Sequence, residues 1–396
     1  QPLDAVYLQI LKNLCTDLSE PVPLDGVDPS ALYRLAEKHV RFRFFAIFEQ
    51  QPQFSALKQQ TKQMLLSYYQ LEHFTRLTFS LLLAEKIPCF LLKGISLAAN
   101  YPIPEYRKLG DLDLYIPEKD AFSRACRILN AHGYTEEPEE SDHHVTYRFT
   151  FPELAAAFEL ELHYRIVGIY QFSRANELVD EIFSASHLKP SFVELYGQTY
   201  PVLPPTENVF YMLHHMLKHY LYSGFGSRLL CDFTLYLERY ASEVNFEKIH
   251  FWCRESKIFH LYELILESCR IYFGLSASID PQVHCSASDC AIFLEKILAD
   301  GDFGSDTQRK IVSSGSYQHT GIHAWFHEGH IQMKLRFPKL HKCVLLWPVL
   351  WVITFFCFLS NTYRIRHTTL RQTLADFRAD NRKTKLLKIF DNNDLQ

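Results

Sequence analysis

Residues 110–116 read Gly110-Asp111-Leu112-Asp113-Leu114-Tyr115-Ile116, so acidic and apolar side chains alternate strictly from Asp111 to Leu114. Side chains on a β-strand point to opposite faces with a period of two. We therefore expect a strand over Leu112–Ile116 whose Leu and Ile side chains enter a core, while Asp111 and Asp113 share the other face. Two carboxylates this close repel each other unless a cation lies between them. The pair predicts a Mg²⁺ site, because Mg²⁺ prefers one or two carboxylates together with waters and substrate phosphates.

A second predicted strand, Ala156–Ile166, has the same alternation. Leu160 and Leu162 face one way, while Glu159, Glu161 and His163 face the other. If the two strands lie side by side, Glu161 or Glu159 completes a three-carboxylate cluster. Three carboxylates are the minimum for a two-metal site that clamps a phosphate.

The loop between Gly94 and Asp111, together with the residues that flank it, supplies cations. Lys93, Arg107 and Lys108 flank the acidic pair, and Gly94 permits close approach of the backbone. A short helix expected at Ser96–Asn100 would offer free N–H groups to a phosphate. The competing interpretation is a half-exposed sheet with a solvated carboxylate face. Convergence of titratable groups favours a functional site.

Helical patterns lie on both sides of this region. Residues 1–85 predict helices at Asp4–Leu14, after Asp28-Pro29-Ser30, and at Gln59–Leu83. The middle region adds a strand at Pro88–Leu92, a helix at Lys119–His132 stopped by Gly133, and a strand at Val145–Phe151 joined to the next by a turn at Pro152-Glu153. From Thr206 the pattern is helical to the end, apart from a loop predicted at Gly301–Gly315 and a polar tail after Leu387.

Bulk composition restricts the function classes. The net charge is −4, so no basic excess indicates a nucleic-acid partner. Ten scattered cysteines without a C-x-x-C pair predict free thiols in a reducing cytoplasm.

The uncharged segment 343–359 predicts a buried or membrane-surface helix in preference to a spanning one, so peripheral membrane association is an alternative localisation.

The chain resembles the uncharacterised bacterial nucleotidyltransferase family of the DNA polymerase β-like superfamily. The resemblance lies in Leu91-Leu92-Lys93-Gly94, Tyr101-Pro102, Arg107, Gly110–Leu114, Gly133-Tyr134 and Glu161-Leu162-His163-Tyr164. It implies an α+β fold in which a small mixed-sheet nucleotidyltransferase core, 86–203, is flanked by helical regions at 1–85 and 204–396. It also implies that Asp111, Asp113 and Glu161 hold two Mg²⁺ ions and that Lys93 and Arg107 meet the triphosphate.

Together these patterns predict an enzyme that transfers an NMP from an NTP to an unidentified small-molecule, peptide or protein acceptor. We assign nucleotide or phosphate binding to Lys93, Gly94, Ser96, Arg107 and His163. Glu161 would ligate the catalytic metal and help to deprotonate the acceptor. The alternatives are a catalytically inactive partner protein with the same fold and a membrane-linked enzyme of surface-polymer or peptide biosynthesis.

Other polar residues receive weaker assignments. His214, His215 and His219 are predicted to be packing or satisfied polar residues, because Met216 replaces the Glu that a zinc protease needs. Arg228 and Asp232 are spaced for a local helix ion pair, or for holding the helical region against the sheet.

Overall fold

The structure is a computed structural model. It describes residues 3–16, 22, 26–39, 55–138, 141–151, 156–170, 172–220 and 225–300, and parts of 326–366. The predicted turn at Pro152-Glu153, the loop at 301–315 and the tail after Leu387 lie outside the described residues.

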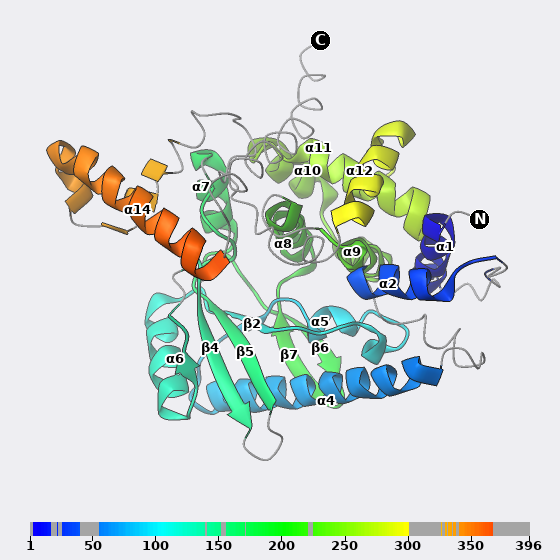
Figure 1. The fold of residues 1–396 in the computed structure, drawn as a ribbon, viewed down its shortest axis with the longest axis horizontal. Helices are drawn as coiled ribbons and strands as arrows, with labels where there is room; N and C mark the ends of the chain where they lie inside the picture. The colour runs from blue at the N-terminus through cyan, green and yellow to red at the C-terminus, as the bar shows by residue number, and fades with distance from the viewer. Residues whose placement is uncertain are drawn as a thin grey trace, which may run out of the picture.

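A seven-stranded mixed sheet forms the centre of the described chain (Figure 1). Its order is β3-β4-β5-β2-β1-β7-β6. The strands are β1 Phe90–Leu91, β2 Leu112–Tyr115, β3 Thr135–Glu136, β4 His144–Phe151, β5 Ala156–His163, β6 Ser191–Leu195 and β7 Gln198–Val202. Neighbours β2 and β5 are parallel, as are β1 and β7, while β1–β2, β3–β4, β4–β5 and β6–β7 are antiparallel.

The expected sheet is correct in type but too small, because β3 and the hairpin of β6 and β7 were not predicted. The hairpin turns at Tyr196 and Gly197, both with positive φ (50° and 73°). Two residues with positive φ make a tight turn that matches the twist of the flanking strands.

Several elements differ from the expected bounds, and the first strand, expected at Pro88–Leu92, is only Phe90–Leu91. The strand predicted to reach Ile166 ends at His163, because the N–H groups of Tyr164 and Arg165 both donate to the carbonyl of His143 and the chain turns there. The short helix expected at Ser96–Asn100 lies at Ile95–Ala98 instead.

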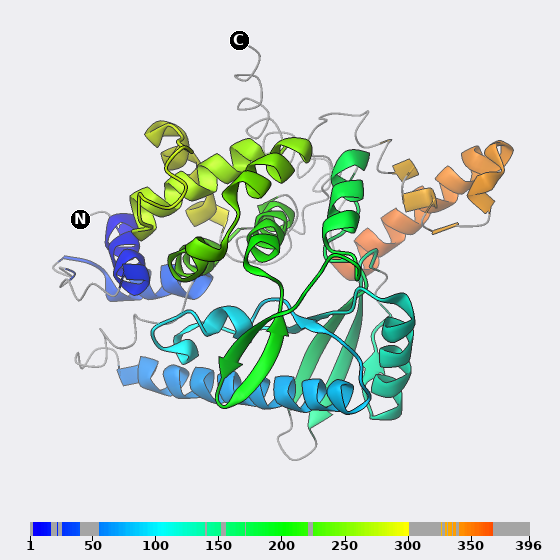
Figure 2. The ribbon, with the colours of Figure 1, turned by 180° about the vertical axis from the view of Figure 1, so that it is seen from behind.

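Helices α4 and α6 cover one face of the sheet (Figures 1 and 2). Leu112 and Leu114 of β2, with Leu160 and Leu162 of β5, point into this apolar layer, as the alternation predicted. Phe74 of α4 stacks on Phe158, with ring centroids 5.3 Å apart. The helices on this side are α4 Ser55–Ala84 and α6 Lys119–Ala131; α5 Ile95–Ala98 and the 3₁₀ turn η2 Pro104–Tyr106 lie in the β1–β2 connection.

A larger helical layer covers the opposite face, where β1 and β2 contribute Phe90, Leu92 and Tyr115 to its core. The N-terminal helices α1 and α2 share this core, whereas α4 belongs to the other one. The layer comprises α1 Leu3–Thr16, α2 Pro29–His39, α7 Ser173–Ile182, α8 Pro205–Lys218, α9 Ser227–Tyr240, η5 Ala241–Glu243, α10 Phe246–Glu255, α11 Phe259–Ser268, the π-helical η6 Cys269–Phe273 and α12 Ala287–Asp300.

The apolar segment near the C-terminus is not part of either core. It forms η7 Leu340–Lys342, η8 Val344–Leu346 and α14 Trp347–Arg366. Leu350 is buried, but most described side chains from Val344 to Phe356 are exposed, so of the two alternatives predicted for this segment, a buried or a membrane-surface helix, the structure does not show the buried one. Of the helices that the structure describes, none has the length and apolarity to cross a membrane.

Candidate functional site: a carboxylate–histidine cluster on the sheet

The sheet register brings the predicted acidic residues together. Strands β2 and β5 pair in parallel, with Asp113 opposite Glu161 and Tyr115 opposite His163. Paired residues of neighbouring strands point to the same face. One ligand atom each from Asp113, Glu161 and His163 lies within 4.8 Å of the other two. The two predicted strands therefore converge as expected, and Glu161 points towards Asp113.

This face is covered, so the competing interpretation of a solvated carboxylate surface is wrong for Asp113. Its side chain is fully buried, and its Oδ2 atom has no hydrogen-bond partner among the described residues. A buried unpaired carboxylate oxygen costs free energy unless a cation or proton binds it. Asp111, at the mouth of the site, is 36% exposed.

Lys93 links the two aspartates. Its Nζ atom lies 3.3 Å from Asp111 Oδ2 and 3.2 Å from Asp113 Oδ1. Burial alone would lower the pKa of Lys93, but Asp111 and Asp113 outweigh it and raise that pKa well above its usual value. The ammonium ion therefore neutralises the acidic pair directly.

His163 links Asp113 to Glu161. Its Nε2 atom lies 3.2 Å from Asp113 Oδ1 and 3.3 Å from Glu161 Oε2. Burial opposes the charge of His163, but hydrogen bonds to these two carboxylates raise its pKa. For Glu161, burial is outweighed by His163 and Lys93, so its pKa is lowered.

Asp113 differs from the other carboxyl groups. Burial and the neighbouring charge of Asp111 raise its pKa to about 6. For Asp111, Lys93 outweighs burial and lowers the pKa. Carboxyl groups whose environments push their pKa values apart are typical of functional sites.

Gly94 forms the turn that presents Lys93. Its φ of 68° and ψ of −114° lie in a region that side-chain-bearing residues avoid, and a Cβ here would lie 3.5 Å from the carbonyl oxygen of Asp111. Ser96 is buried two residues later, where its hydroxyl donates to the carbonyl of Lys93 over 3.3 Å. Helix α5 behind this turn has only four residues.

Arg107 lies apart from the carboxylate cluster. Its Nε and Nη2 atoms donate to the two carboxylate oxygens of Asp232 on α9, at 2.8 and 2.7 Å, and Tyr101 donates to the same carboxylate at 2.7 Å. Arg228 donates to the carbonyl of Lys108. Asp232 and Arg228 thus hold the β1–β2 connection against α9, which agrees with the second of the two interpretations of that pair.

Sequence reasoning missed several residues around the cluster. Lys218 at the end of α8 lies with Nζ 3.0 Å from His143 Nε2, and His144 Nε2 is 3.9 Å from Glu161 Oε1. Tyr211 is fully buried nearby, where burial and the charge of Asp113 raise its pKa. The His143-His144 pair at the start of a strand was the only sequence signal for these contacts.

The predicted packing role is confirmed for His214. Its Nδ1 atom is 2.9 Å from the hydroxyl of Tyr170, and its ring packs edge-on against Phe210 with centroids 4.5 Å apart. Burial lowers the pKa of His214 to about 3, so the ring is neutral.

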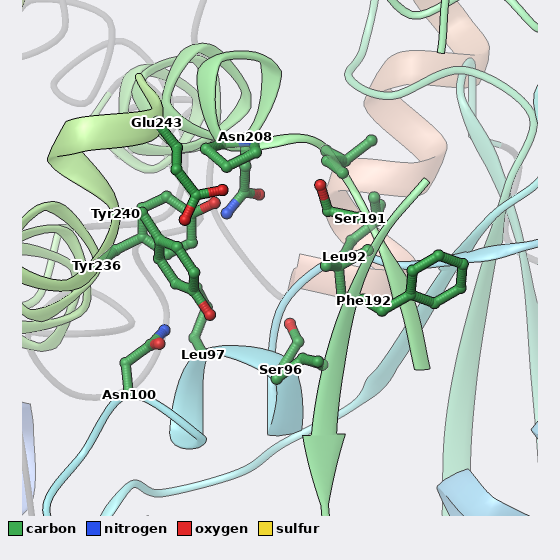
Figure 3. A pocket seen from close by; sticks show the side chains of 14 residues that line it. Leu92, Ser96, Leu97, Asn100, Ser191, Phe192, Asn208, Tyr236, Tyr240 and Glu243 are labelled. Atoms are coloured by element: carbon green, nitrogen blue, oxygen red, sulfur yellow. The ribbon is translucent and has the colours of Figure 1, made fainter. Parts of the chain in front are cut away.

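A cavity of about 240 Å³ lies near the Lys93 turn, and Figure 3 shows the side chains that line it. Leu92, whose N–H donates to the carbonyl of Asp113, forms part of its wall, and Ser96 forms another part. The polar lining residues are Ser96, Asn100, Ser191, Asn208, Tyr236, Tyr240 and Glu243. No lysine or arginine is among the lining residues, so the cavity suits an uncharged group better than a phosphate.

Comparisons with known proteins agree with the sequence resemblance at the level of the nucleotidyltransferase family, whereas the bacterial origin and the DNA polymerase β-like superfamily stay predictions. A crystal structure of an antigenic nucleotidyltransferase-like protein from Paracoccidioides brasiliensis is similar at 14% identity over 52% of this chain and 94% of that chain, with a TM-score of 0.34, which is too low to support a statement about this fold. The curated proteins contain no significant match to the sequence. The family described as "Uncharacterised nucleotidyltransferase" matches residues 25–274, well over half of the sequence. The chain therefore belongs to this family of uncharacterised nucleotidyltransferases.

Proposed function

We propose that the protein is a Mg²⁺-dependent nucleotidyltransferase that transfers an NMP from an NTP to an acceptor and releases pyrophosphate. The observation that supports this most is the convergence of Asp113, Glu161 and His163 from paired strands, next to Asp111 and Lys93. Membership of a nucleotidyltransferase family supports the reaction class.

The donor set fits hard divalent cations. Asp111, Asp113 and Glu161 would hold two Mg²⁺ ions, and the unpartnered Oδ2 atom of Asp113 is available as a ligand. Bound Mg²⁺ would polarise the α-phosphate and stabilise negative charge on the departing pyrophosphate. The lowered pKa of Glu161 favours the role of ligand over that of proton acceptor.

The chain's own residues would orient the nucleotide. Lys93 already contacts both aspartates, so its ammonium ion lies where it would meet the phosphates held over them. Gly94 allows the backbone of this turn to approach the phosphates closely. The cavity, whose lining includes no lysine or arginine, would receive an uncharged part of a substrate, and Ser96 borders both the Lys93 turn and this cavity.

Arg107 was expected to bind phosphate, and its contacts support a positioning role instead. A guanidinium group with two hydrogen bonds to a buried carboxylate is committed to that partner. We propose that Arg107 holds the connection that carries Lys93 and Asp111.

Incubation of the full chain with each α-labelled NTP and Mg²⁺ tests the proposal. We expect label to be transferred to the protein or to a component of a cell lysate. Glu161→Gln and Asp113→Asn should abolish the transfer, whereas Glu194→Gln on the exposed side of β6 should not alter it. Absence of transfer with all four NTPs would contradict the proposed reaction.

The second candidate is a non-catalytic protein that keeps the fold and binds a nucleotide or a protein. The observation in its favour is that Lys93 contacts both aspartates, so its ammonium ion can neutralise them in the place of a metal ion. Calorimetry distinguishes the candidates: Mg-NTP binding without turnover would favour this second function, and turnover that disappears in Glu161→Ala would exclude it.

We also propose that the protein works in the cytoplasm and associates peripherally with membranes through 343–359. All ten cysteines are free, which supports a reducing compartment, and the exposed apolar side chains of η8 and α14 support the membrane contact. Fractionation of cells into soluble and membrane pools tests this.

A further inference from the structure

Three histidines converge beside the carboxylate cluster, where β4 begins and β5 ends. His144 and His163 are opposite each other in the antiparallel β4–β5 pair, and His143 immediately precedes β4. One ring nitrogen of each lies within 4.8 Å of the others. The ring centroids are 4.4 Å apart for His143–His144, 5.1 Å for His144–His163 and 5.5 Å for His143–His163.

Polar contacts at Nδ1 make Nε2 the ring nitrogen that His143 and His144 would each offer to a metal ion. His143 Nδ1 lies 2.8 Å from Asp142 Oδ1, and Asp142 is itself fixed by the N–H of Ile169. A carboxylate on Nδ1 holds the proton there, so Nε2 keeps its lone pair, as in metal-bound histidines. His144 Nδ1 lies 3.1 Å from the hydroxyl of Ser141.

His163 can bind a metal only through its other ring nitrogen. Its Nε2 atom donates to Asp113 and Glu161, so Nδ1 is the nitrogen left for a metal ion, which must displace any proton there. That Nδ1 atom is buried and has no hydrogen-bond partner among the described residues. A buried nitrogen with nothing to bind is explained most simply by an ion or water that completes it.

We propose that His143, His144 and His163 form a second metal site, for a transition metal ion of the Zn²⁺ type. Three imidazoles with an open fourth position are typical of such ions, whereas Mg²⁺ selects oxygen ligands. The site is therefore chemically distinct from the carboxylate cluster, with which it shares the His163 ring.

Lys218 is the natural competitor for this ion. Its ammonium group lies 3.0 Å from His143 Nε2, so it takes the lone pair that a metal would need. Metal binding therefore requires this ammonium group to leave His143 Nε2. A metal on His163 would also polarise the ring and strengthen its hydrogen bonds to Asp113 and Glu161.

The test is a Co²⁺ titration of the metal-stripped full chain in excess Mg²⁺, which blocks the oxygen-ligand site. We expect one Co²⁺ per chain with the intense visible absorption of a tetrahedral nitrogen-ligated ion. His143→Ala and His144→Ala should each weaken binding by about tenfold or more, while His132→Ala on the exposed end of α6 should not alter it. Lys218→Met should bind Co²⁺ about tenfold more tightly, because it removes the competing cation.

Circular dichroism and thermal melting establish that each variant is folded. Lack of the tetrahedral absorption in the wild-type chain would overturn the inference, as would its persistence in both folded histidine variants. The Lys218→Met result does not depend on a loss of folding, so unchanged or weaker Co²⁺ binding there would also overturn it. None of these readings depends on NTP turnover, so they remain valid if the proposed function fails.

Discussion

Replacing Lys93 with Met should destabilise the metal-free protein and make it respond more strongly to Mg²⁺. At 3.2 Å, the Lys93–Asp113 pair has a Coulomb energy of about 5 kcal/mol at an effective dielectric constant of about 20. The Asp111 contact adds little, because that side chain is more than a third exposed and an exposed pair contributes about 0–1 kcal/mol. Removing one partner of a buried pair costs about 3–5 kcal/mol, so we expect a loss of that size in the free energy of unfolding.

Mg²⁺ should return part of this loss. A divalent cation that binds only the folded state at about 100 times its dissociation constant contributes about 2.7 kcal/mol. In Lys93→Met no ammonium ion repels the metal, so Mg²⁺ should raise the free energy of unfolding by more than it does in the wild-type protein. Urea unfolding with EDTA and with Mg²⁺ measures both quantities.

Lys248→Met on α10 is the matched control, since Lys248 is exposed and lies far in the sequence from Asp111 and Asp113. It should alter the free energy of unfolding by no more than about 0.5 kcal/mol. The reasoning is refuted if Lys93→Met costs no more than this control, or if Mg²⁺ stabilises the variant no more than the wild type.

Three further outcomes follow from the same geometry. Asp232→Ala should lower the free energy of unfolding by about 3–5 kcal/mol, because it removes the carboxylate partner of the buried Arg107 guanidinium group. In a double-mutant cycle with Arg107→Met, the second change should cost much less than it does alone, and additive costs would show that the pair is not coupled. Because the pKa of Asp113 is raised to about 6, from a usual value of 3.8, the folded metal-free chain binds more protons between these values than the unfolded chain, so its stability should fall as pH rises through this window. Mg²⁺ affinity, measured by calorimetry, should rise over the same interval and change little above it, and a flat profile would contradict a ligand role for Asp113. Gly94→Ala should cost about 1–3 kcal/mol because of its positive φ, whereas Gly110→Ala, where a Cβ meets nothing within 4 Å, should be tolerated; equal melting temperatures for the two variants would count against backbone strain at Gly94.

Local periodicity was sufficient to predict which face of the sheet carries the carboxylates. The alternation around Asp113 and around Glu161 determines which side chains share a face, and it correctly separated them from Leu112 and Leu160. Gly133 was also predictable as a helix stop, since it has a φ of 85° just after α6. These features depend on residues a few positions apart in the sequence, where the geometry of the backbone determines the direction of each side chain.

Features that depend on distant partners could not be predicted in the same way. Nothing near Arg107 in the sequence indicates that Asp232, 125 residues later, binds its guanidinium group. The pairing of Lys218 with His143 is of the same kind, with 75 residues between them. The hairpin at Tyr196-Gly197 is different, because its Gly between two alternating segments was a local signal that the sequence did contain.

The helical layer is part of the site rather than a support outside it. The sheet supplies the carboxylates and His163, but helix α8 supplies Lys218, and α9 supplies the Asp232 that fixes the connection between Lys93 and Asp111. Burial by this layer raises the pKa of Asp113 and removes hydrogen-bond partners from its Oδ2 atom and from His163 Nδ1. An isolated sheet would leave these groups hydrated, with ordinary pKa values and weak affinity for an ion. Metal binding should therefore depend on the residues of α8 and α9 as strongly as on those of β2 and β5.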